Sequence, residues 1–317
     1  MGRRGGLSIP VISGTPYPYE TLTSTVADQW FADDVAIVGE TGSTYVVRLQ
    51  DAGKDIRCGT SNELFVDYDL DAALWLLDVQ TAGGNVTQPR INAADVFYQA
   101  EKAAGIYGNW IRFYFPIWGV TAANAICIKS RTSGTFFGGV THGAGFVQGD
   151  GSSGYFSLGD SMSSLGLDGS DVSVFTLEHV GPNADSMSSF GAANSVRSGR
   201  VGSGTRSHEF QGTTNRVLIS PASQHGIYFM GKDTPNTSYA FRRTSPGIAE
   251  TANGSGSTSG SNGTDLEMMR RGGFGDHYSN ARIGAAGIGT GMSYANASAA
   301  SERLKTFWEA CTGLTLT

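Results

Sequence analysis

The sequence predicts a mainly β protein made of stacked-sheet sandwiches, with a few helices between and after the strands. Three observations predict this class. The chain has 317 residues, of which 45 are glycines scattered without the three-residue period of collagen. Only 16% of the residues are charged, against about 25% in typical globular domains. Apolar runs of about 4–6 residues alternate with turn sequences, as sandwich strands do.

The strands expected in residues 8–66 are short and follow one another closely. We expect them at Pro10–Gly14, Gln29–Phe31, Val35–Val38, Thr44–Val47 and Ile56–Cys58. Asp33-Asp34, Gly39–Gly42 and Asp51–Lys54 supply the turns between them. Residues 1–7 precede this region as an N-terminal arm, in which Arg3 and Arg4 form a small basic cluster.

In residues 67–108 the apolar residues recur at helical rather than strand spacing. The recurring positions are Leu70, Ala73, Leu74 and Leu77, followed by Ala93, Val96, Phe97, Ala100 and Ala104. We therefore expect a helical connector of two amphipathic helices that bury these stripes in a core. Asn92 is expected to cap the second helix, and Gly83-Gly84 and Gly105 to end the two helices.

Residues 109–317 return to the strand pattern and close with a helix. The expected strands are Ile111–Phe115, Ala125–Ile128, Gly145–Val147, Tyr155–Leu158, Asp171–His179, Ser188–Ala192, Arg216–Ile219, Gly226–Met230, Ser238–Arg243, Leu266–Met269 and Ala281–Ile288. Thr251–Asp265 is almost wholly Gly, Ser, Thr and Asn and is expected to be a loop. Ser293 is expected to cap the last helix, which turns Ala300, Leu304, Phe307, Trp308 and Cys311 inward.

The bulk properties exclude several classes of function. A net charge of −6 argues against a nucleic-acid partner, which needs clustered Lys and Arg. The chain lacks an apolar run of about 18 residues and the apolar core of a signal peptide, so neither membrane insertion nor secretion is expected. Cys58, Cys127 and Cys311 form no C-x-x-C pair, which predicts free buried thiols in place of a zinc or redox motif. We expect no cofactor.

Gly159-Asp160-Ser161-Met162 resembles the nucleophile block of GDSL-type hydrolases. Such a serine needs a base with an orienting carboxylate, which that family supplies as Asp-x-x-His. None of the five histidines has Asp three residues before it; they are His142, His179, His208, His225 and His277. The block is therefore expected to be a turn, and no catalytic residue is predicted.

Other motifs are weaker still. Gly226–Lys232 has the spacing of a phosphate-binding loop, but Asp233 replaces the required Ser or Thr, so a strand followed by a turn is expected. Glu178 and Glu267 sit on separate expected strands, without the paired arrangement that glycoside hydrolysis needs. Asp168 and Asp171 are too few for a calcium site, and no metal site is predicted.

Three residues have side chains that stack on sugars or pack locally: Trp118, His277 and Tyr278. The ligand-binding residues stay unknown at this point.

Residues 8–66 resemble the bacterial and phage immunoglobulin-like repeat. The resemblance lies in Gln29–Ile37, Thr41–Tyr45 and Asp51–Cys58. It implies that Trp30 packs between two sheets and that Cys58 lies on a later strand. Since the partner cysteine of a disulfide-bonded domain is missing, Cys58 is expected to be a buried free thiol.

Residues 67–317 are similar to phage tail and virion proteins that pair two helices with a concanavalin-like, laminin-G-like jelly-roll sandwich and a C-terminal helix. Four blocks recur in the order of that family: Val79–Val86, Ala103–Ile106, Gly149–Phe156 and Ala281–Ser293. The chain departs from the family in Thr251–Asp265 and in the insert Gly181–Arg206.

The resemblance implies a bacteriophage virion structural protein: a tail, fibre, collar or head-decoration subunit, assembled in the host cytoplasm. Its expected partners are other virion proteins, copies of itself and a host-surface glycan, which it would bind through a lectin-like domain without catalysis. Two alternatives stay open. One is a phage-borne polysaccharide or ester hydrolase, and the other is a free bacterial adhesin or lectin module.

Overall fold

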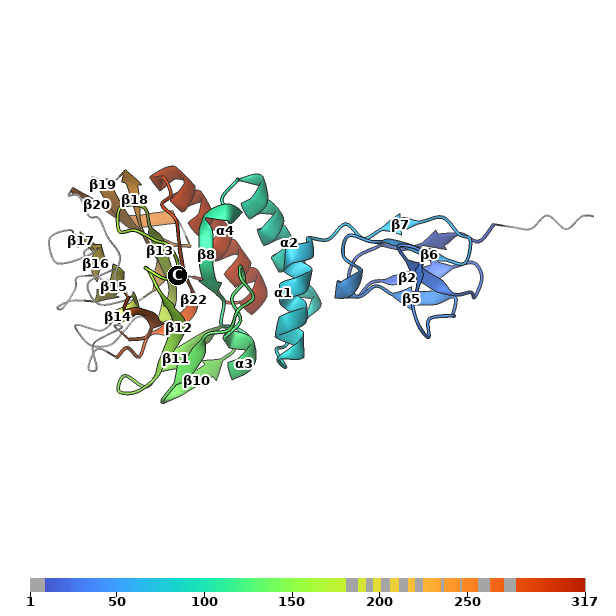
Figure 1. Cartoon of the computed structure of the whole chain (residues 1–317), viewed down its shortest axis with the longest axis horizontal. Coiled ribbons are helices and arrows are strands. Elements are labelled where there is room, and N and C mark those ends of the chain that lie inside the picture. The colour runs from blue at the N-terminus through green and yellow to red at the C-terminus, as the bar shows by residue number, and fades with distance from the viewer. Residues whose placement is uncertain are drawn as a thin grey trace, which may run out of the picture. The chain divides into compact units, whose positions relative to one another are not determined.

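The computed structural model describes residues 9–180, 188–191, 196–200, 206–210, 216–219, 225–234, 237–245, 247–255, 263–270 and 278–316. The chain divides into two compact units, residues 1–77 and 78–317 (Figure 1). Antiparallel sheets dominate both units, which confirms the predicted mainly β class. No helix in these ranges combines the length and apolarity that crossing a membrane requires.

The first unit contains a three-stranded and a four-stranded antiparallel sheet. The first has the order β1-β2-β5, with β1 at Ile12–Ser13, β2 at Thr21–Ser24 and β5 at Thr44–Val46. The second has the order β4-β3-β6-β7, with β4 at Val35–Ala36, β3 at Trp30–Ala32, β6 at Asp55–Cys58 and β7 at Leu64–Phe65. The strands β2 and β7 were not predicted.

Trp30 and Cys58 lie opposite each other on β3 and β6, and neither is accessible to solvent. The Trp30 ring stacks on Tyr45 of the other sheet, with ring centroids 5.5 Å apart. Its indole N–H donates to the Gly42 carbonyl at 2.8 Å. The predicted core tryptophan and buried free thiol are therefore both present.

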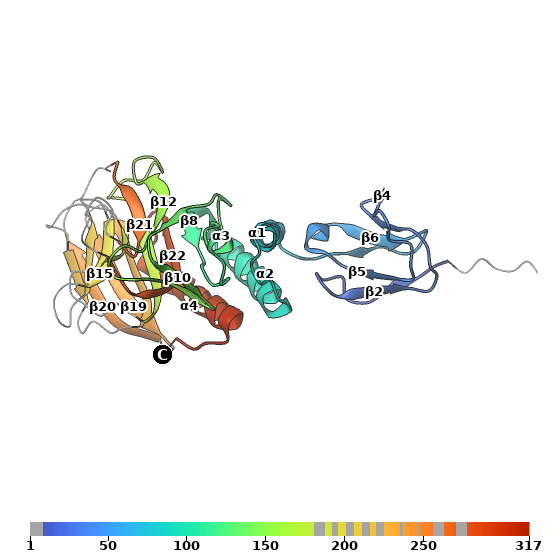
Figure 2. The ribbon, with the colours of Figure 1, turned by 90° about the horizontal axis from the view of Figure 1, so that it is seen from below.

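The second unit contains an eight-stranded and a seven-stranded antiparallel sheet within the described ranges (Figure 2). The first has the order β10-β11-β22-β13-β18-β19-β20, and β8 also pairs with β22. Its strands are β8 Trp110–Tyr114, β10 Val140–Gly143, β11 Phe146–Gly149, β13 Ser173–Val180, β18 Gly226–Thr234, β19 Thr237–Thr244, β20 Gly247–Ser255 and β22 Arg282–Gly289.

The seven-stranded sheet has the order β17-β16-β15-β14-β21-β12-β9. Its strands are β9 Thr135–Phe137, β12 Tyr155–Ser161, β14 Ser188–Gly191, β15 Val196–Arg200, β16 Arg206–Phe210, β17 Arg216–Ile219 and β21 Asp265–Met268. The two sheets share one hydrophobic core. Val174, Met230 and Ile283 of the eight-stranded sheet join Phe156 and Met268 of the seven-stranded sheet in it.

The helix α4 Tyr294–Thr312 packs on the other face of the eight-stranded sheet, and α2 Gln88–Ala103 packs on α4. The other helices are α1 Leu70–Thr81, which spans the boundary between the units, and the short α3 Thr121–Asn124. The Trp308 indole of α4 lies in the core and donates to the Gly145 carbonyl at 3.0 Å. Ser293 caps α4 by accepting from the Asn296 N–H, as predicted. All five predicted inward residues of α4 are buried.

The prediction for α2 was wrong in two respects. The helix begins at Gln88 with Thr87 as its N-cap, so Asn92 lies inside it. Pro89 in the first turn marks this earlier start, because proline fits where the backbone N–H needs no partner. The buried stripe consists of Ile91, Ala94, Asp95, Phe97, Tyr98 and Glu101. Val96, predicted to be in the core, is 64% exposed.

One predicted strand and one predicted loop also need correction. Ala125–Ile128 forms only isolated bridges, of Cys127 with Tyr114 and of Ile126 with Ser133. The expected loop Thr251–Asp265 begins in β20 and ends in β21. β20 pairs with β19 along its whole length, and these ladder hydrogen bonds offset the low strand propensity of its Gly, Ser and Asn. The middle of that segment, residues 256–262, lies outside the described residues, as does most of the insert Gly181–Arg206.

Candidate functional site

Ser161 of the hydrolase-like block lies at the end of β12, before a turn. Its hydroxyl accepts a hydrogen bond from the Ser164 N–H at 3.1 Å, and the Ser164 hydroxyl donates back to the Ser161 carbonyl. Asp160 forms an ion pair with Arg112 at 2.6 Å. The block is therefore not the turn that was expected, because Gly159, Asp160 and Ser161 end the strand β12 and the turn begins at Met162; the hydroxyl of Ser161 supports that turn.

The structure does not bring Glu178 and Glu267 together. Val174 of β13 faces the core. Thr176 and Glu178 follow it at every second position of the strand, so they lie on the same face and point into the space between the sheets. The Thr176 hydroxyl donates to Glu178 Oε1 at 3.2 Å on that face. Glu267 alternates with core residues of β21 and points to the outer face of the other sheet. One sheet separates the two carboxylates, so they share no cleft.

Three of the five histidines have described side chains: His142, His179 and His225. The first two belong to local packing. His142 contacts Asn124 and the Phe136 ring. His179 packs against the Trp308 ring at 5.5 Å. Its pKa lies below the ordinary value because of burial and the nearby Arg282 and His225. The side chains of His208 and His277 lie outside the described residues.

The weaker motifs fall into regular structure. Gly226–Met230 lies in the strand β18, as predicted, but the expected turn is absent because β18 continues through Lys232, which is buried, to Thr234. Asp168 accepts from the Ser170 N–H, whereas Asp171 accepts from the Gly291 N–H on another loop. Within the described ranges no group of three His, Cys, Asp or Glu side chains is arranged to hold a metal ion.

The two aromatic side chains singled out from the sequence have different surroundings. Trp118 is buried, and the Arg90 guanidinium lies 5.1 Å from its ring centroid. Tyr278 is half-buried and lies beside Arg270, with which it forms an isolated β-bridge. Trp118 therefore packs locally, whereas Tyr278 belongs to a cluster that the sequence did not reveal.

That cluster is a row of side chains on the outer face of the seven-stranded sheet. Phe156 and Met268 point into the core, so their neighbours Tyr155 and Glu267 point outward. Phe137 of β9 pairs directly with Tyr155 of β12. We call the set the aromatic row: Phe137, Tyr155, Arg270 and Tyr278.

Within the aromatic row, the Tyr155 ring lies between Phe137 and Arg270. The Phe137 and Tyr155 rings are nearly parallel, at 13°, with centroids 4.8 Å apart. The Arg270 guanidinium carbon lies 3.6 Å from the Tyr155 centroid and 5.8 Å from that of Tyr278. The Phe137 ring and the Arg270 guanidinium cannot occupy the same face of Tyr155 without overlapping, so they cover opposite faces of that ring. Phe137 therefore ends the row.

Glu267 holds Arg270 in this position. Arg270 Nε donates to Glu267 Oε2 at 2.6 Å, and Arg270 Nη2 donates to Glu267 Oε1. The Glu267 side chain is only 3% exposed, so the pair is largely shielded from water. A two-point guanidinium–carboxylate contact of this kind fixes both position and plane. The remaining nitrogen, Nη1, lies 3.5 Å from the Tyr278 hydroxyl.

The turn that follows Phe137 packs against the loop before β12. A Cβ on Gly138 would lie 2.3 Å from the Ser153 carbonyl oxygen, and one on Gly139 would lie 2.4 Å from Asp150 Oδ2. Asp150 itself accepts hydrogen bonds from Ser153 and from the backbone of residues 152–154. These bonds hold the pKa of Asp150 well below its usual range, so the carboxylate stays charged.

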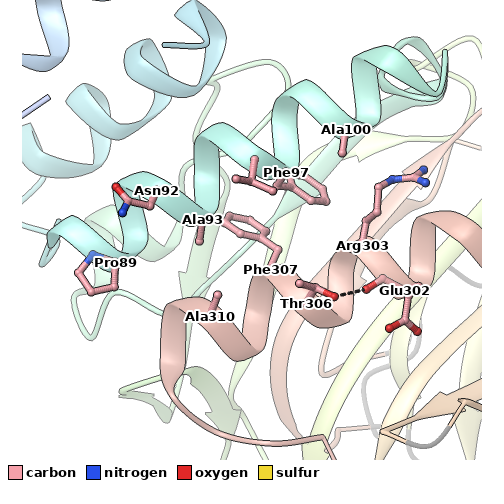
Figure 3. A pocket seen from close by; sticks show the side chains of 11 residues that line it. Pro89, Asn92, Ala93, Phe97, Ala100, Glu302, Arg303, Thr306, Phe307 and Ala310 are labelled. Atoms are coloured by element: carbon pink, nitrogen blue, oxygen red, sulfur yellow. Dashed lines mark hydrogen bonds between the residues drawn. The ribbon is translucent and has the colours of Figure 1, made fainter. Parts of the chain in front are cut away.

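An apolar groove of about 370 Å³ lies elsewhere on the second unit, between α2 and α4 (Figure 3). Phe97 and Phe307 stack at its floor, with ring centroids 4.5 Å apart. Its walls include Val96, Ala93 and Ala310. Ala93, Val96 and Ala100, which the sequence assigned to a core, thus line an open groove instead, whereas Phe97 is buried as predicted. Nothing in the described residues indicates what covers it.

Comparisons with known proteins add little to this geometry. No family model and no curated protein matches the chain. One similar solved structure is domain 4 of AbnA, a GH43 extracellular arabinanase from Geobacillus stearothermophilus, in complex with arabinotriose. The similarity has a TM-score of 0.39 at 14% identity and covers 61% of this chain and 98% of that domain. A similarity this weak carries no argument about function.

Proposed function

We propose that this chain is a structural protein of a bacteriophage particle that attaches to a host-surface glycan without catalysis. In this proposal residues 8–66 form an immunoglobulin-like module, and the second unit is a concanavalin-like, lectin-like sandwich. Its place is the virion, as a tail, fibre, collar or head-decoration subunit. Its partners are other virion proteins and further copies of itself.

The observation that carries the proposal is the aromatic row. Phe137 is 43% exposed, although a phenyl ring normally gains from burial. The ring stands on an edge strand, and a paired glutamate and arginine support its neighbour Tyr155. Exposed aromatic rings held on a rigid sheet are suited to stacking on a ligand and have no reactive group to offer.

Two features of the fold also support the proposal. In the first unit, Trp30 and Tyr45 pack between two antiparallel sheets, as in an immunoglobulin-like module. In the second unit, two large antiparallel sheets share one core, and α4 closes the chain, as in the phage proteins that the sequence resembles.

The attachment proposal is tested by incubating the intact protein with purified polysaccharides of the host envelope. We expect retention of the protein on at least one polysaccharide, with no new reducing ends after prolonged incubation. Release of reducing ends would favour a hydrolase, and the absence of retention on every polysaccharide would contradict attachment.

The virion proposal is tested on purified particles of the phage that encodes the chain. We expect mass spectrometry to detect the protein in particles purified by density gradient, and antibodies against it to slow adsorption to host cells. Absence of the protein from such particles would overturn a structural role.

A further inference from the structure

We infer that the Phe137 end of the aromatic row binds a neutral hexopyranose unit of a glycan and disfavours acidic sugars. This inference rests on the proposed attachment function and names its ligand class. Three features of the surface support it: the free ring face, the rigidity of its support and the charge around it.

The first feature is the free face of Phe137. Among the described strands β9 is the outermost of its sheet, and Tyr155 covers one face of the Phe137 ring. The face of an aromatic ring is the negative part of its quadrupole. The axial C–H groups of a hexopyranose carry slight positive charge and form a flat apolar patch, so they suit such a face.

The second feature is the rigidity of the ring's support. The Phe137 ring stacks on Tyr155, whose other face is covered by the guanidinium that Glu267 fixes. The turn at Gly138-Gly139 is locked against the loop of Ser153, because neither glycine has room for a Cβ. A ring held in this way loses little conformational freedom when a ligand stacks on it.

The third feature is charge. Among the described side chains of this surface, Arg270 is neutralised by Glu267, and Asp150 adds a negative charge next to the turn. The carboxylate of a uronic acid would meet this negative charge, and none of those described side chains offers it an unpaired cation. A neutral sugar brings no such repulsion, and its hydroxyls form hydrogen bonds of ordinary strength.

The test compares two sets of oligosaccharides of equal length by isothermal titration calorimetry with the intact chain. One set consists of neutral gluco- and galacto-oligosaccharides, and the other of oligogalacturonate. We expect heat of binding with a neutral ligand and none with oligogalacturonate at the same concentrations. Equal or tighter binding of oligogalacturonate would overturn the inference.

Variants locate the site. Phe137→Ala should weaken neutral binding by about tenfold or more, whereas Phe137→Tyr should keep it because the ring face remains. Phe65→Ala is the matched control, since Phe65 is 51% exposed but lies in the first unit. Unchanged binding by Phe137→Ala would contradict the site, while leaving glycan attachment itself intact.

A further variant tests the charge argument. Asp150→Asn removes the negative charge beside the turn, so we expect oligogalacturonate binding to appear. Glu302→Gln, which removes a 46% exposed carboxylate of α4, should not produce this gain. If Asp150→Asn is folded by circular dichroism and still does not bind oligogalacturonate, the charge argument is wrong. If the intact chain binds neither these ligands nor any host polysaccharide, the proposed attachment function fails along with the inference.

Discussion

The imidazole of His142 is held in one tautomer by its neighbour. The backbone N–H of Trp118 donates to Asn124 Oδ1 at 2.7 Å, so the Asn124 amide NH₂ faces His142 Nδ1 at 3.0 Å. His142 Nδ1 therefore accepts a hydrogen bond, and Nε2 carries the proton. Burial lowers the pKa of His142 as well. The folded state thus favours the neutral ring.

This preference predicts a pH dependence of stability. Because the folded pKa of His142 is depressed, the unfolded state binds the proton first, and stability falls as the pH drops below about 6.5, the unfolded value. The free energy of unfolding in urea should therefore decline from about pH 7.5 to about pH 5.5. His142→Gln should flatten this decline, whereas His179 stays in both proteins and its contribution cancels. If the unfolding free energy declines equally with pH in the parent and in His142→Gln, His142 does not contribute to the pH dependence.

Glu101 is a buried carboxylate that joins two elements. It has no accessible surface, and it accepts from the Trp110 indole at 2.9 Å and from Arg303 Nε at 2.5 Å. Glu101→Gln removes the charge from the second bond, so we expect a loss of about 1–3 kcal/mol in unfolding free energy. Glu302→Gln is the control, since that side chain is 46% exposed and its ion pairs should contribute less than about 1 kcal/mol. Urea denaturation measures both variants, and an equal loss of unfolding free energy in Glu101→Gln and Glu302→Gln would contradict a special role for Glu101.

At the scale of elements, α4 packs closely on β22 because Gly284 has no side chain. A Cβ at Gly284 would lie 2.4 Å from Trp308 Nε1, the atom that donates to the Gly145 carbonyl. Gly284→Ala should therefore push α4 outward and cost about 1–3 kcal/mol, measured as a lower midpoint of urea denaturation. Gly108→Ala, where a Cβ meets nothing within 4 Å, should have little effect. A Gly284→Ala protein as stable as the parent would show that α4 adjusts freely.

The elements also show how far the sequence predicts the fold. For α4 the cap at Ser293 and the inward stripe were both predicted, because one strong N-cap precedes a regular apolar period. For α2 the periodicity placed Val96 inside, because two apolar stripes share this helix and spacing alone does not choose between them. β20 was missed because it is defined by its pairing with β19, which propensity does not encode.

The candidate site was harder to predict because it, too, depends on which strands pair. Phe137, Tyr155 and Arg270 are far apart in sequence and meet only because β9, β12 and β21 are adjacent in the sheet. Nothing in a single sequence fixes that strand order. Tyr278 was noticed as an aromatic residue in an expected loop, but its neighbours come from the sheet topology. A signal was present in the paired glycines after Phe137, which mark a close approach of backbones.

On the scale of the whole molecule, both units depend on packed cores without disulfide bonds. Cys58 lies in the core of the first unit, and Cys127 and Cys311 lie in the second. The thiol of Cys127 accepts from the Phe113 N–H at 3.3 Å, and Cys58 contacts the backbone carbonyls of Val26 and Asp28. Each cysteine therefore serves as a small buried apolar side chain.

This arrangement predicts how the thiols react. Burial raises the pKa of the Cys311 thiol, and only the thiolate is nucleophilic. We expect iodoacetamide at about pH 8, near the ordinary cysteine pKa, to leave the native chain unlabelled, whereas the same treatment in guanidinium chloride adds three labels, one for each free cysteine. Mass spectrometry counts the labels, and thermal unfolding should be the same with and without a reducing agent. A reducing agent that lowered the melting temperature, or a denatured chain with a single reactive thiol, would reveal a disulfide and contradict a fold held by packing alone.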